Sequence, residues 1–506
     1  MQHKQGENRN QFYMFSLEGS IAANAMVRVL DAFVDAIDLK SFGFAHVECH
    51  EEGRPPYHPS VLLKLYLYGY HYGIRTTRKL EREAHTNMEA MWLLSGLRPK
   101  YKTIADFRKN HSKAFREVFR KFVCLLKEWN LVEGETVAID SFKIRGSNSL
   151  KNNFNQAKLK RHLDYIDNQI AEYEALLDSN DTLEDKKELE DKIAKRLEKR
   201  ARYEQIKSDL EQSQQEQISL TDPDSRSVIL HKNIVNVGYN VQASSDAKHK
   251  LLVEYNTGDV NDTHALAPMA IETKKLLGKE SLNVLADKGY HTGEQLEACE
   301  RNGIITYVSP KAPSTKDIGL YPISNFTYDQ EHDHYICPQG EILTTNGRWH
   351  RHSNSPKNGQ GGYRFKRYNN AVCKSCASSH LCTQSQKNVR NIDRSQYAHS
   401  IEANAKRVES NPEYYRQRQQ IVEHPFGTLK RQRGFTHTLV RGKGKVLGEV
   451  GLMFIGYNLS RCINILGIKK LVMLLTGSYL RVLSYKNRLI LSPYKDFIFF
   501  KLKYAC

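Results

Sequence analysis

Two short apolar runs, each ending in a single aspartate, constrain the fold of this chain more than any other feature. The runs Thr136 to Asp140 and Val284 to Asp287 are aliphatic almost up to the acid, which predicts strands buried in a sheet. A third segment, Val422 to Lys430, reads as a helix that carries Glu423 and leads into basic residues. Three carboxylates from distant parts of a chain can converge on two divalent metals, an arrangement suited to in-line displacement at phosphate.

Taken singly, each of these acids is a weak indication. An aspartate at a strand end is more often a helix N-cap than a catalytic group. The intervals from Asp140 to Asp287 and from Asp287 to Glu423 are both long, and inserted modules would account for them. Glu423 is preferred as the third acid because basic residues follow it, although Glu402 and Glu413 lie nearby.

The excess of basic residues narrows the class of partner. The 506 residues carry a formal net charge of +18 and a sequence pI of about 9.3, which points to a polyanion such as nucleic acid or to an anionic membrane surface. The membrane alternative is weaker, because no run approaches the ~18 apolar residues of a spanning helix and the N-terminus is too polar for a signal peptide. We therefore expect an intracellular, cytoplasmic protein without a membrane partner, whose nine cysteines are thiols or metal ligands.

A chain of this length is expected to form about two to four domains. Changes in composition and periodicity along the sequence indicate where they lie. Residues 15–130 read as helical, and a capping signal at Thr103 predicts one helix from there toward Trp129. The region is either a small DNA-binding domain of helix-turn-helix type or a helical bundle with a solvated basic face. Its basic residues include Arg75, Arg78, Lys79, Arg82, Lys100, Lys102, Arg108 and Lys109.

Strands that alternate with helices predict a mixed α/β core made of residues 131–156, 218–319 and 396–465. Residues 157–217 carry two apolar stripes around a turn-forming cluster, which predicts an antiparallel helical hairpin inserted into the core. The charged outside of this hairpin is most simply a solvated face, with a dimerisation or DNA-clamping arm as the alternative. Residues 466–506 form an apolar tail for which packing is the simplest role.

A second insertion, residues 320–395, has few aliphatic residues and several cysteines. A Cys-x-x-Cys pair suits zinc, but the first half of the segment supplies one cysteine, so a Cys₄ zinc site and a reduced set of thiols both stay open. Basic residues that alternate with aromatic residues suit contact with a nucleic-acid backbone and base stacking, while an exposed strand pair is the plainer interpretation. The residues concerned are Cys337, Cys373, Cys376, Cys382 and Trp349.

Four segments in this order resemble bacterial insertion-sequence transposases of the DDE type. They are similar to the first-acid segment, the strand after the insertion, the second-acid segment and the third-acid segment: Val137 to Arg145, Gly238 to Ala243, Leu285 to Tyr290 and Val422 to Arg431. The stretch from Tyr57 to Arg108 resembles the InsH-type N-terminal domain of the same transposases. The resemblance spans about residues 15–465 and implies an RNase H-like catalytic core behind a helical N-terminal domain.

The resemblance also implies an activity. The protein would bind the ends of its insertion sequence, cut them and join the 3′-OH to target DNA, as a homodimer on double-stranded DNA. Asp140, Asp287 and Glu423 would hold two Mg²⁺ or Mn²⁺ ions. Some relatives flip a base at the transposon end onto a tryptophan of the insertion, for which Trp349 is the candidate. The other expected DNA contacts are Tyr415, Arg418, Lys430, Arg431, Arg433, Lys143, Arg145 and Lys288.

One departure from the helix signature of these transposases, Tyr-x2-Arg-x3-Glu-x6-Lys, concerns the third acid. One extra residue separates Arg418 from Glu423, and one residue turns an ideal helix by about 100°, so these two side chains are not expected to share a face. Gln419 holds the aligned place. Pro425 lacks an N–H and is expected to kink the helix or to begin a new one.

Three other functions fit parts of the sequence. The first is a nuclease of the same fold that does not join cut ends to a target. The second is a DNA-binding regulator derived from a transposase, against which the presence of all three acids argues. The third is a coiled-coil scaffold, which leaves the strand-end aspartates unexplained.

Overall fold

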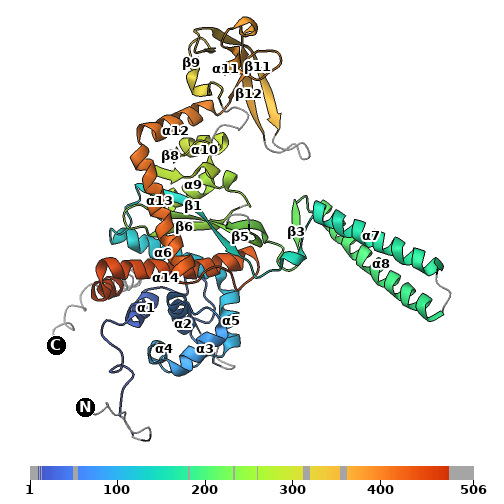
Figure 1. Cartoon of the computed structure of the whole chain (residues 1–506). Helices are drawn as coiled ribbons and strands as arrows, with labels where there is room; N and C mark the ends of the chain where they lie inside the picture. The colour runs from blue at the N-terminus through green and yellow to red at the C-terminus, as the bar shows by residue number, and fades with distance from the viewer. Residues whose placement is uncertain are drawn as a thin grey trace, which may run out of the picture.

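The computed structural model describes residues 10, 12, 14–48, 55–179, 183–231, 234–258, 260–311, 319–353 and 362–477. Figure 1 shows a central body of helices and sheet, a long helical arm that leaves the body on one side, and a small β unit at the end farthest from the first helices. These parts follow the order of the predicted segments. Whether each of them is a domain with the predicted boundaries stays a prediction.

Helices make up the N-terminal part of the body, as predicted. They are α1 (Met26–Asp35), α2 (Pro59–Tyr72), α3 (Thr77–Thr86), α4 (Met88–Leu93), α5 (Tyr101–Asn110) and α6 (Ser112–Glu128). The prediction of one helix from Thr103 to Trp129 is wrong, because the chain breaks between α5 and α6 at His111. The His111 ring contacts the Phe107 carbonyl oxygen at 2.9 Å through Nδ1 and accepts the Ala45 amide through Nε2 at 3.0 Å, which holds the break in place.

A mixed sheet forms the centre of the body, as the alternation of strands and helices predicted. Its strands are β1 (Thr136–Arg145), β4 (Arg226–His231), β5 (Ile234–Asp246), β6 (Leu252–Thr257), β7 (Leu282–Ala286) and β8 (Ile304–Val308). β1 runs antiparallel to β5 and parallel to β7, and β8 lies parallel beside β7. Helices α9 (Leu266–Leu277) and α10 (Gly293–Arg301) connect β6 to β7 and β7 to β8. This order of strands and helices is that of an RNase H-like core.

The chain returns to the body through a series of helices after the β unit. These are α12 (Ala398–Ser410), α13 (Pro412–Gly427), a π turn, η7 (Thr428–Gln432), and α14 (Lys443–Leu466). Among the described residues no helix is long and apolar enough to cross a membrane. Most of the predicted apolar tail, residues 478–506, lies outside the described residues.

Helix α14 lies between the N-terminal helices and the sheet and joins them into one hydrophobic core (Figure 1). The Phe454 ring contacts Phe119 of α6 and Tyr255 of β6 edge to face. Gly448 permits the close approach of α14 to the start of α6, because a Cβ at this position would lie 2.6 Å from the Cα atom of Ser112. The helical part is therefore packed against the sheet rather than tethered to it.

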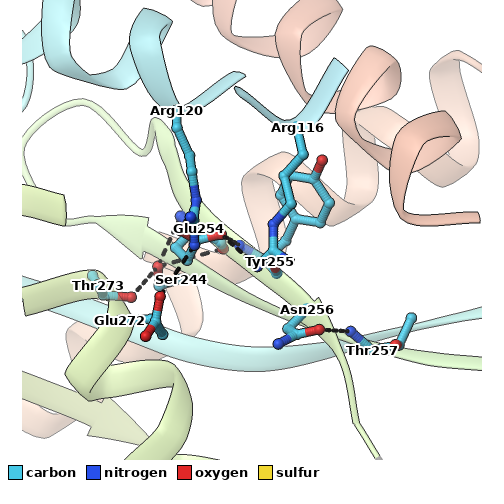
Figure 2. A network of polar contacts seen from close by, with 9 residues as sticks. All are labelled: Arg116, Arg120, Ser244, Glu254, Tyr255, Asn256, Thr257, Glu272 and Thr273. Atoms are coloured by element: carbon cyan, nitrogen blue, oxygen red, sulfur yellow. Dashed lines mark hydrogen bonds and ion pairs between the residues drawn. The ribbon is translucent and has the colours of Figure 1, made fainter. Parts of the chain in front are cut away.

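Glu254 on β6 is fully buried and ties α6 to the sheet, as Figure 2 shows. Its carboxylate receives Arg116 Nη2 at 3.3 Å and Arg120 Nε at 2.9 Å, both from α6. Its backbone amide donates to Ser244 Oγ on β5 at 3.1 Å, and Arg120 Nη2 also reaches Glu272 Oε2 on α9 at 3.1 Å. Glu254 and the two arginines thereby link α6, β5, β6 and α9 to one another.

The predicted helical hairpin is confirmed as the arm that leaves the body (Figure 1). It consists of α7 (Gln156–Ser179) and α8 (Leu183–Gln212), which rest on a two-stranded ladder of β2 (Asn153–Asn155) and β3 (Gln217–Ser219). Leu159, Ile206 and Leu210 are buried between the two helices near this ladder. The apolar stripes of the sequence are therefore the inner seam of the hairpin.

The β unit is an antiparallel sheet with a small core of its own. Its strands are β9 (Thr327–Asp329), β10 (His334–Ile336), β11 (Ile342–Ser353), β12 (Gly362–Asn369) and β13 (Ile392–Ser395). Phe326, Tyr335, Leu343, Tyr368 and Ile392 fill the core. The cysteine-bearing segments, η6 (Ala371–Ser375) and α11 (Ser379–Cys382), connect β12 to β13.

Replacing Glu254 by Gln should lower the free energy of unfolding by about 3–5 kcal/mol, because two arginines would lose a buried counter-charge. Glu272→Gln is the matched control, since Glu272 contacts the same Arg120 but is 45% exposed, and it should lower the stability by about 1 kcal/mol or less. Urea denaturation of both variants measures the difference. Equal losses in the two variants would contradict the role given to Glu254.

Candidate active site

The register of the central sheet brings Asp140 and Asp287 to the same level. β1 and β7 run parallel with Ala138 opposite Leu285, and each aspartate lies two residues further along its chain. Asp140 is half-buried within β1, and its Oδ1 accepts the Ser141 amide at 2.7 Å. Asp287 stands just beyond β7, where its Oδ1 accepts an amide hydrogen bond at 2.8 Å as the N-cap of the short helix η3 (Lys288–Tyr290).

A further carboxylate, Asp262, joins these two and was not predicted. It opens the short helix η2 (Asp262–His264), between β6 and α9. Its Oδ1 accepts hydrogen bonds from Asn240 Nδ2 at 2.7 Å and Gln242 Nε2 at 2.6 Å, and its Oδ2 accepts Ser141 Oγ at 3.5 Å. Unlike the two predicted aspartates, Asp262 does not end an apolar run but lies several residues beyond the end of β6, so the sequence offered no comparable signal.

Helix α13 lies against β1 and supplies a cation to the site. Arg418 Nη1 lies 3.4 Å from Asp140 Oδ2, and the Tyr414 hydroxyl contacts Thr136 Oγ1 at 2.7 Å one turn earlier. Glu423, on the same helix, is exposed, and its Oε1 accepts Gln419 Nε2 at 2.7 Å. Gln419 rather than Arg418 therefore shares a face with Glu423.

The end of α13 differs from the prediction made for Pro425. The helix continues through Pro425 to Gly427 and then widens into the π turn, in which the Arg433 amide bonds to the Thr428 carbonyl oxygen at 3.1 Å. π turns are rare and occur frequently at functional sites. This one places Lys430 Nζ 5.0 Å from the centre of the Phe142 ring, two residues beyond Asp140 on β1.

The electrostatics of the site disfavour negative charge on Asp140. Burial raises the pKa of Asp140 to about 6, against the opposing effects of the Ser141 amide and Arg418, and the nearby Asp287 and Asp262 raise it further. Burial lowers the pKa of Lys430, an effect that Asp140 opposes. A bound cation would offset the burial of Asp140, which is the main cause of its raised pKa, together with the charges of its two neighbours.

The geometry fits divalent metals in one further respect. Gly289 leaves open the space between two of the acids, since a Cβ there would lie 2.9 Å from Asp287 Oδ1 and 3.8 Å from Asp262 Oδ2. The carboxylate oxygens of the three aspartates, Asp140, Asp262 and Asp287, do not all lie within 4.8 Å of one another. Among the described residues, Asp329, His332 and His334 have ligand atoms that meet this spacing. A wider set of carboxylates suits two ions about 4 Å apart better than a single ion.

The remaining predicted DNA contacts differ in how far their side chains are exposed. Arg145, Lys288 and Arg431 are exposed, whereas Lys143 and Tyr415 are half-buried. Arg433 points inward instead: its guanidinium donates to Ser460 Oγ of α14, and burial lowers its pKa to about 10. We therefore assign Arg433 to the packing of α14 and no longer to DNA.

Two of the basic residues in the N-terminal helical part are also internal. Arg75 is buried and donates to the His437 carbonyl oxygen at 2.5 Å. Arg108 is buried as well and donates to the Arg75 carbonyl oxygen at 3.2 Å. Neither side chain can belong to a solvated basic face.

The four cysteines of the β unit gather around one cavity of about 170 Å³, although they come from different segments. Cys337 follows β10, Cys373 and Cys376 lie in and after η6, and Cys382 ends α11. The Cys337 thiol accepts the Gln339 amide at 3.4 Å, and burial raises the pKa of the Cys382 thiol, with the other three thiols raising it further. The number of thiols suits a structural zinc ion, but no three of them lie within 4.8 Å of one another, so zinc would have to draw them together.

Trp349 stands on β11 opposite Lys366 of β12 and is 48% exposed. Lys366 Nζ and the Arg364 guanidinium lie 5.5 Å and 5.6 Å from the centre of its ring. The alternation of basic and aromatic residues in the sequence has therefore become a cationic aromatic surface on an exposed strand pair.

A group of three metal-ligand side chains in the β unit was also missed. Asp329, His332 and His334 have their ligand atoms within 4.8 Å of one another, and His332 Nδ1 lies 2.7 Å from Asp329 Oδ2. The close spacing Asp-x2-His-x-His was the available signal. An ion pair between Asp329 and His332 already accounts for the contact.

Two family models match parts of the chain, and neither match includes Asp140, Asp262 or Asp287. A family described as a transposase domain (DUF772) matches residues 15–110, and a family described as a transposase DDE domain matches residues 336–463. The second match includes Glu423 and the helices α12 to α14. No curated protein matches the chain significantly.

A solved structure, described as a cryo-EM structure of the piggyBac transposase synaptic complex with hairpin DNA, also matches. The match covers 92% of this chain and 82% of that chain, with 11% sequence identity and a TM-score of 0.31.

The raised pKa of Asp140 predicts how stability depends on pH without metal. Because the folded state holds the Asp140 proton up to about pH 6 and the unfolded state loses it near 3.8, stability should fall as pH rises between these values. Asp140→Asn removes this effect, so in chelator its stability gain over wild type should grow from pH 4 to pH 6 and reach about 1–3 kcal/mol above pH 6. Urea denaturation across this pH range measures it. A gain that does not change with pH would contradict the assignment.

Proposed function

We propose that this chain, which matches a DUF772 transposase domain over residues 15–110 and a transposase DDE domain over residues 336–463, is a DDE transposase of an insertion sequence that cuts and joins DNA. In this proposal the protein binds the ends of its own element, cleaves them by metal-dependent phosphoryl transfer, and joins the 3′-OH to target DNA. The two family matches support the class of enzyme. The chemistry rests on the site described above.

The single observation that carries the chemistry is the placement of Asp140 beside Asp287 on neighbouring parallel strands. Carboxylates fixed by a sheet and crowded enough to raise a pKa are suited to holding Mg²⁺ or Mn²⁺. When bound, two such ions activate the attacking oxygen and stabilise the leaving oxygen. Asp140 and Asp287 would hold them, with Glu423 as the third acid.

The assignment of Glu423 rests on the third-acid segment and on its family match. Glu423 is exposed on helix α13, and its carboxylate accepts a hydrogen bond from Gln419 one turn away. For Glu423 to approach Asp140, the Gln419 bond must be given up. We propose that bound metal and DNA provide the interactions that replace it.

The cations around the acids have a task in binding the substrate. Arg418 lies against Asp140, and Lys430 lies over Phe142 with its charge partly desolvated. Once metal neutralises the carboxylates, these two side chains are free to bind the oxygens of the phosphate under attack. Their positions on α13 and the π turn orient that phosphate over β1.

We propose that the DNA backbone continues along the exposed cations Arg145, Lys288 and Arg431 and the half-buried Lys143 and Tyr415. Trp349 and its flanking cations would form a second contact in the β unit, suited to stacking a base. A homodimer on paired element ends, working on DNA in the bacterial cytoplasm and its nucleoid, completes the proposal.

We also propose that Cys337, Cys373, Cys376 and Cys382 bind one structural Zn²⁺ ion. Three of the four thiols come from the connection between β12 and β13, so a metal would fasten this connection to the end of β10. Because the thiols bind as thiolates, zinc uptake would release protons.

Each of the three acids should be needed for cleavage. Asp140→Asn, Asp287→Asn and Glu423→Gln should each lower the rate of metal-dependent cleavage of element-end DNA by about a thousandfold or more, since each removes a metal ligand. Glu413→Gln is the matched control, because Glu413 lies on the same helix but pairs with Arg416 in solvent, and it should cleave at the wild-type rate. If Asp140→Asn cleaved element-end DNA at the wild-type rate, the proposed mechanism would be wrong.

A nuclease of the same fold is distinguished by the fate of the cut ends. A transposase should join precut element ends with a 3′-OH to a supercoiled target plasmid, and a nuclease should leave them unjoined. Gel analysis of the plasmid reports the product. Cleavage without joined product would favour the nuclease.

Metal analysis of purified full-length protein should find about one zinc per chain. Cys373→Ser combined with Cys376→Ser should abolish it, whereas Cys124→Ser, outside the β unit, should leave it unchanged. The double variant should also make the β unit more susceptible to limited proteolysis. Wild-type protein with about a tenth of an equivalent of zinc or less would refute this site.

A further inference from the structure

We propose that Asp262 is a further metal-holding carboxylate of the active site, held in place by Asn240 and Gln242. This inference rests on the proposed function and deepens it, because it changes the set of acids that binds metal. Asp262 lies far from Asp140 and Asp287 in the sequence, and no family match covers it.

One oxygen of the Asp262 carboxylate is fixed by two side-chain amides of β5. Asn240 and Gln242 stand two residues apart on β5, so their side chains lie on the same face, and both amides donate to Asp262 Oδ1. Both residues are almost completely buried, at 2% and 1% exposure. Tyr290, also buried, donates its hydroxyl to Gln242 Oε1 and thereby orients the Gln242 amide toward Asp262.

Burying two primary amides is unfavourable unless their hydrogen bonds are made. Here both amides donate to one carboxylate oxygen, and a charged acceptor makes stronger hydrogen bonds than a neutral one. A carboxylate that only capped its own turn would bond to backbone amides. The bonds of the Asp262 carboxylate instead come from the side chains of β1 and β5.

The other oxygen of the Asp262 carboxylate lies on the side of Asp287. Asp262 Oδ2 lies 3.5 Å from Ser141 Oγ and on the side of Gly289, where the missing Cβ leaves space next to Asp287. Ser141 connects the acids, because its amide holds Asp140 and its hydroxyl contacts Asp262. Asp262 also contributes to the raised pKa of Asp140, as expected for neighbouring charges.

The three aspartates carry more negative charge than the nearby cations balance. Three carboxylates face two nearby cations, Arg418 and Lys430, and the charged form of Lys430 is itself disfavoured by burial. The surplus of negative charge suits divalent cations held between Asp262, Asp140 and Asp287. Because Asp262 is fixed before metal binds, it offers a preorganised ligand, whereas Glu423 has to leave Gln419 first.

The test compares Asp262→Asn with wild type in the full-length chain. The isosteric amide can still accept from Asn240 and Gln242 but loses the charge offered to metal. We expect the Mg²⁺ concentration that gives half-maximal cleavage of element-end DNA to rise by about tenfold or more, with part of the rate recovered at high Mg²⁺. Titration of Mn²⁺ followed by electron paramagnetic resonance should show the same loss of affinity without DNA.

Asp222→Asn is the matched control. Asp222 is likewise a buried aspartate that holds structure together, accepting Tyr239 OH at 2.7 Å and the Gly442 amide at 3.1 Å. This variant should lose stability and keep the wild-type dependence on Mg²⁺. A shift of equal size in both variants would show that the effect at Asp262 is structural and would overturn the inference.

Two further variants separate the possible failures. If Asp140→Asn still cleaves, the proposed function fails; if Asp140→Asn is inactive while Asp262→Asn keeps the wild-type Mn²⁺ affinity, this inference alone fails. If Asp262→Asn does not fold, Asp262→Glu keeps the charge but displaces it by one methylene. Asp262→Glu should then raise the Mg²⁺ requirement by about threefold or more, and an unchanged requirement would overturn the inference.

Discussion

The buried carboxylate of Glu254 is the interaction on which the arrangement of the rest depends. Two arginines of α6 neutralise it inside the body, and its amide is bonded to β5 (Figure 2). The strand that carries Glu254 leads within a few residues to Asp262 and then to α9, while β5 carries Asn240 and Gln242. The ion pair therefore holds the N-terminal helices against the strands that carry the residues around Asp262. An isolated domain cut at the end of α6 would leave Glu254 buried without its partners, which is strongly unfavourable.

The active site accumulates charge that the fold alone does not neutralise. Asp140 is buried near two other carboxylates, so its ionisation without metal is disfavoured and its pKa rises to about 6. Buried amides, a serine and a glycine without a Cβ nevertheless hold this cluster in place. A site that is unfavourable alone and favourable with cations is what metal-dependent phosphoryl transfer requires. The π turn adds Lys430 on the side of β1 where phosphate would lie.

The sequence allowed the mixed core, the helical arm and the positions of Asp140 and Asp287 to be predicted, because strand ends and helical stripes are local patterns. Asp262 ends no apolar run, and its hydrogen bonds come from amides on another strand, a pairing that appears only in the folded chain. The extra residue before Glu423 correctly separated it from Arg418. The contact of Arg433 with Ser460 of α14 could not be predicted, because tertiary packing of this kind leaves no trace in the local sequence.

The central claim is that the aspartate cluster holds two divalent ions. Anomalous diffraction from crystals of the full-length protein grown with Mn²⁺ tests it most directly, because it locates the ions independently of activity. The account predicts two Mn²⁺ ions about 4 Å apart, within coordination distance of Asp140, Asp262 and Asp287. Crystals with Mn²⁺ at Asp329, His332 and His334 but none between the three aspartates would contradict it.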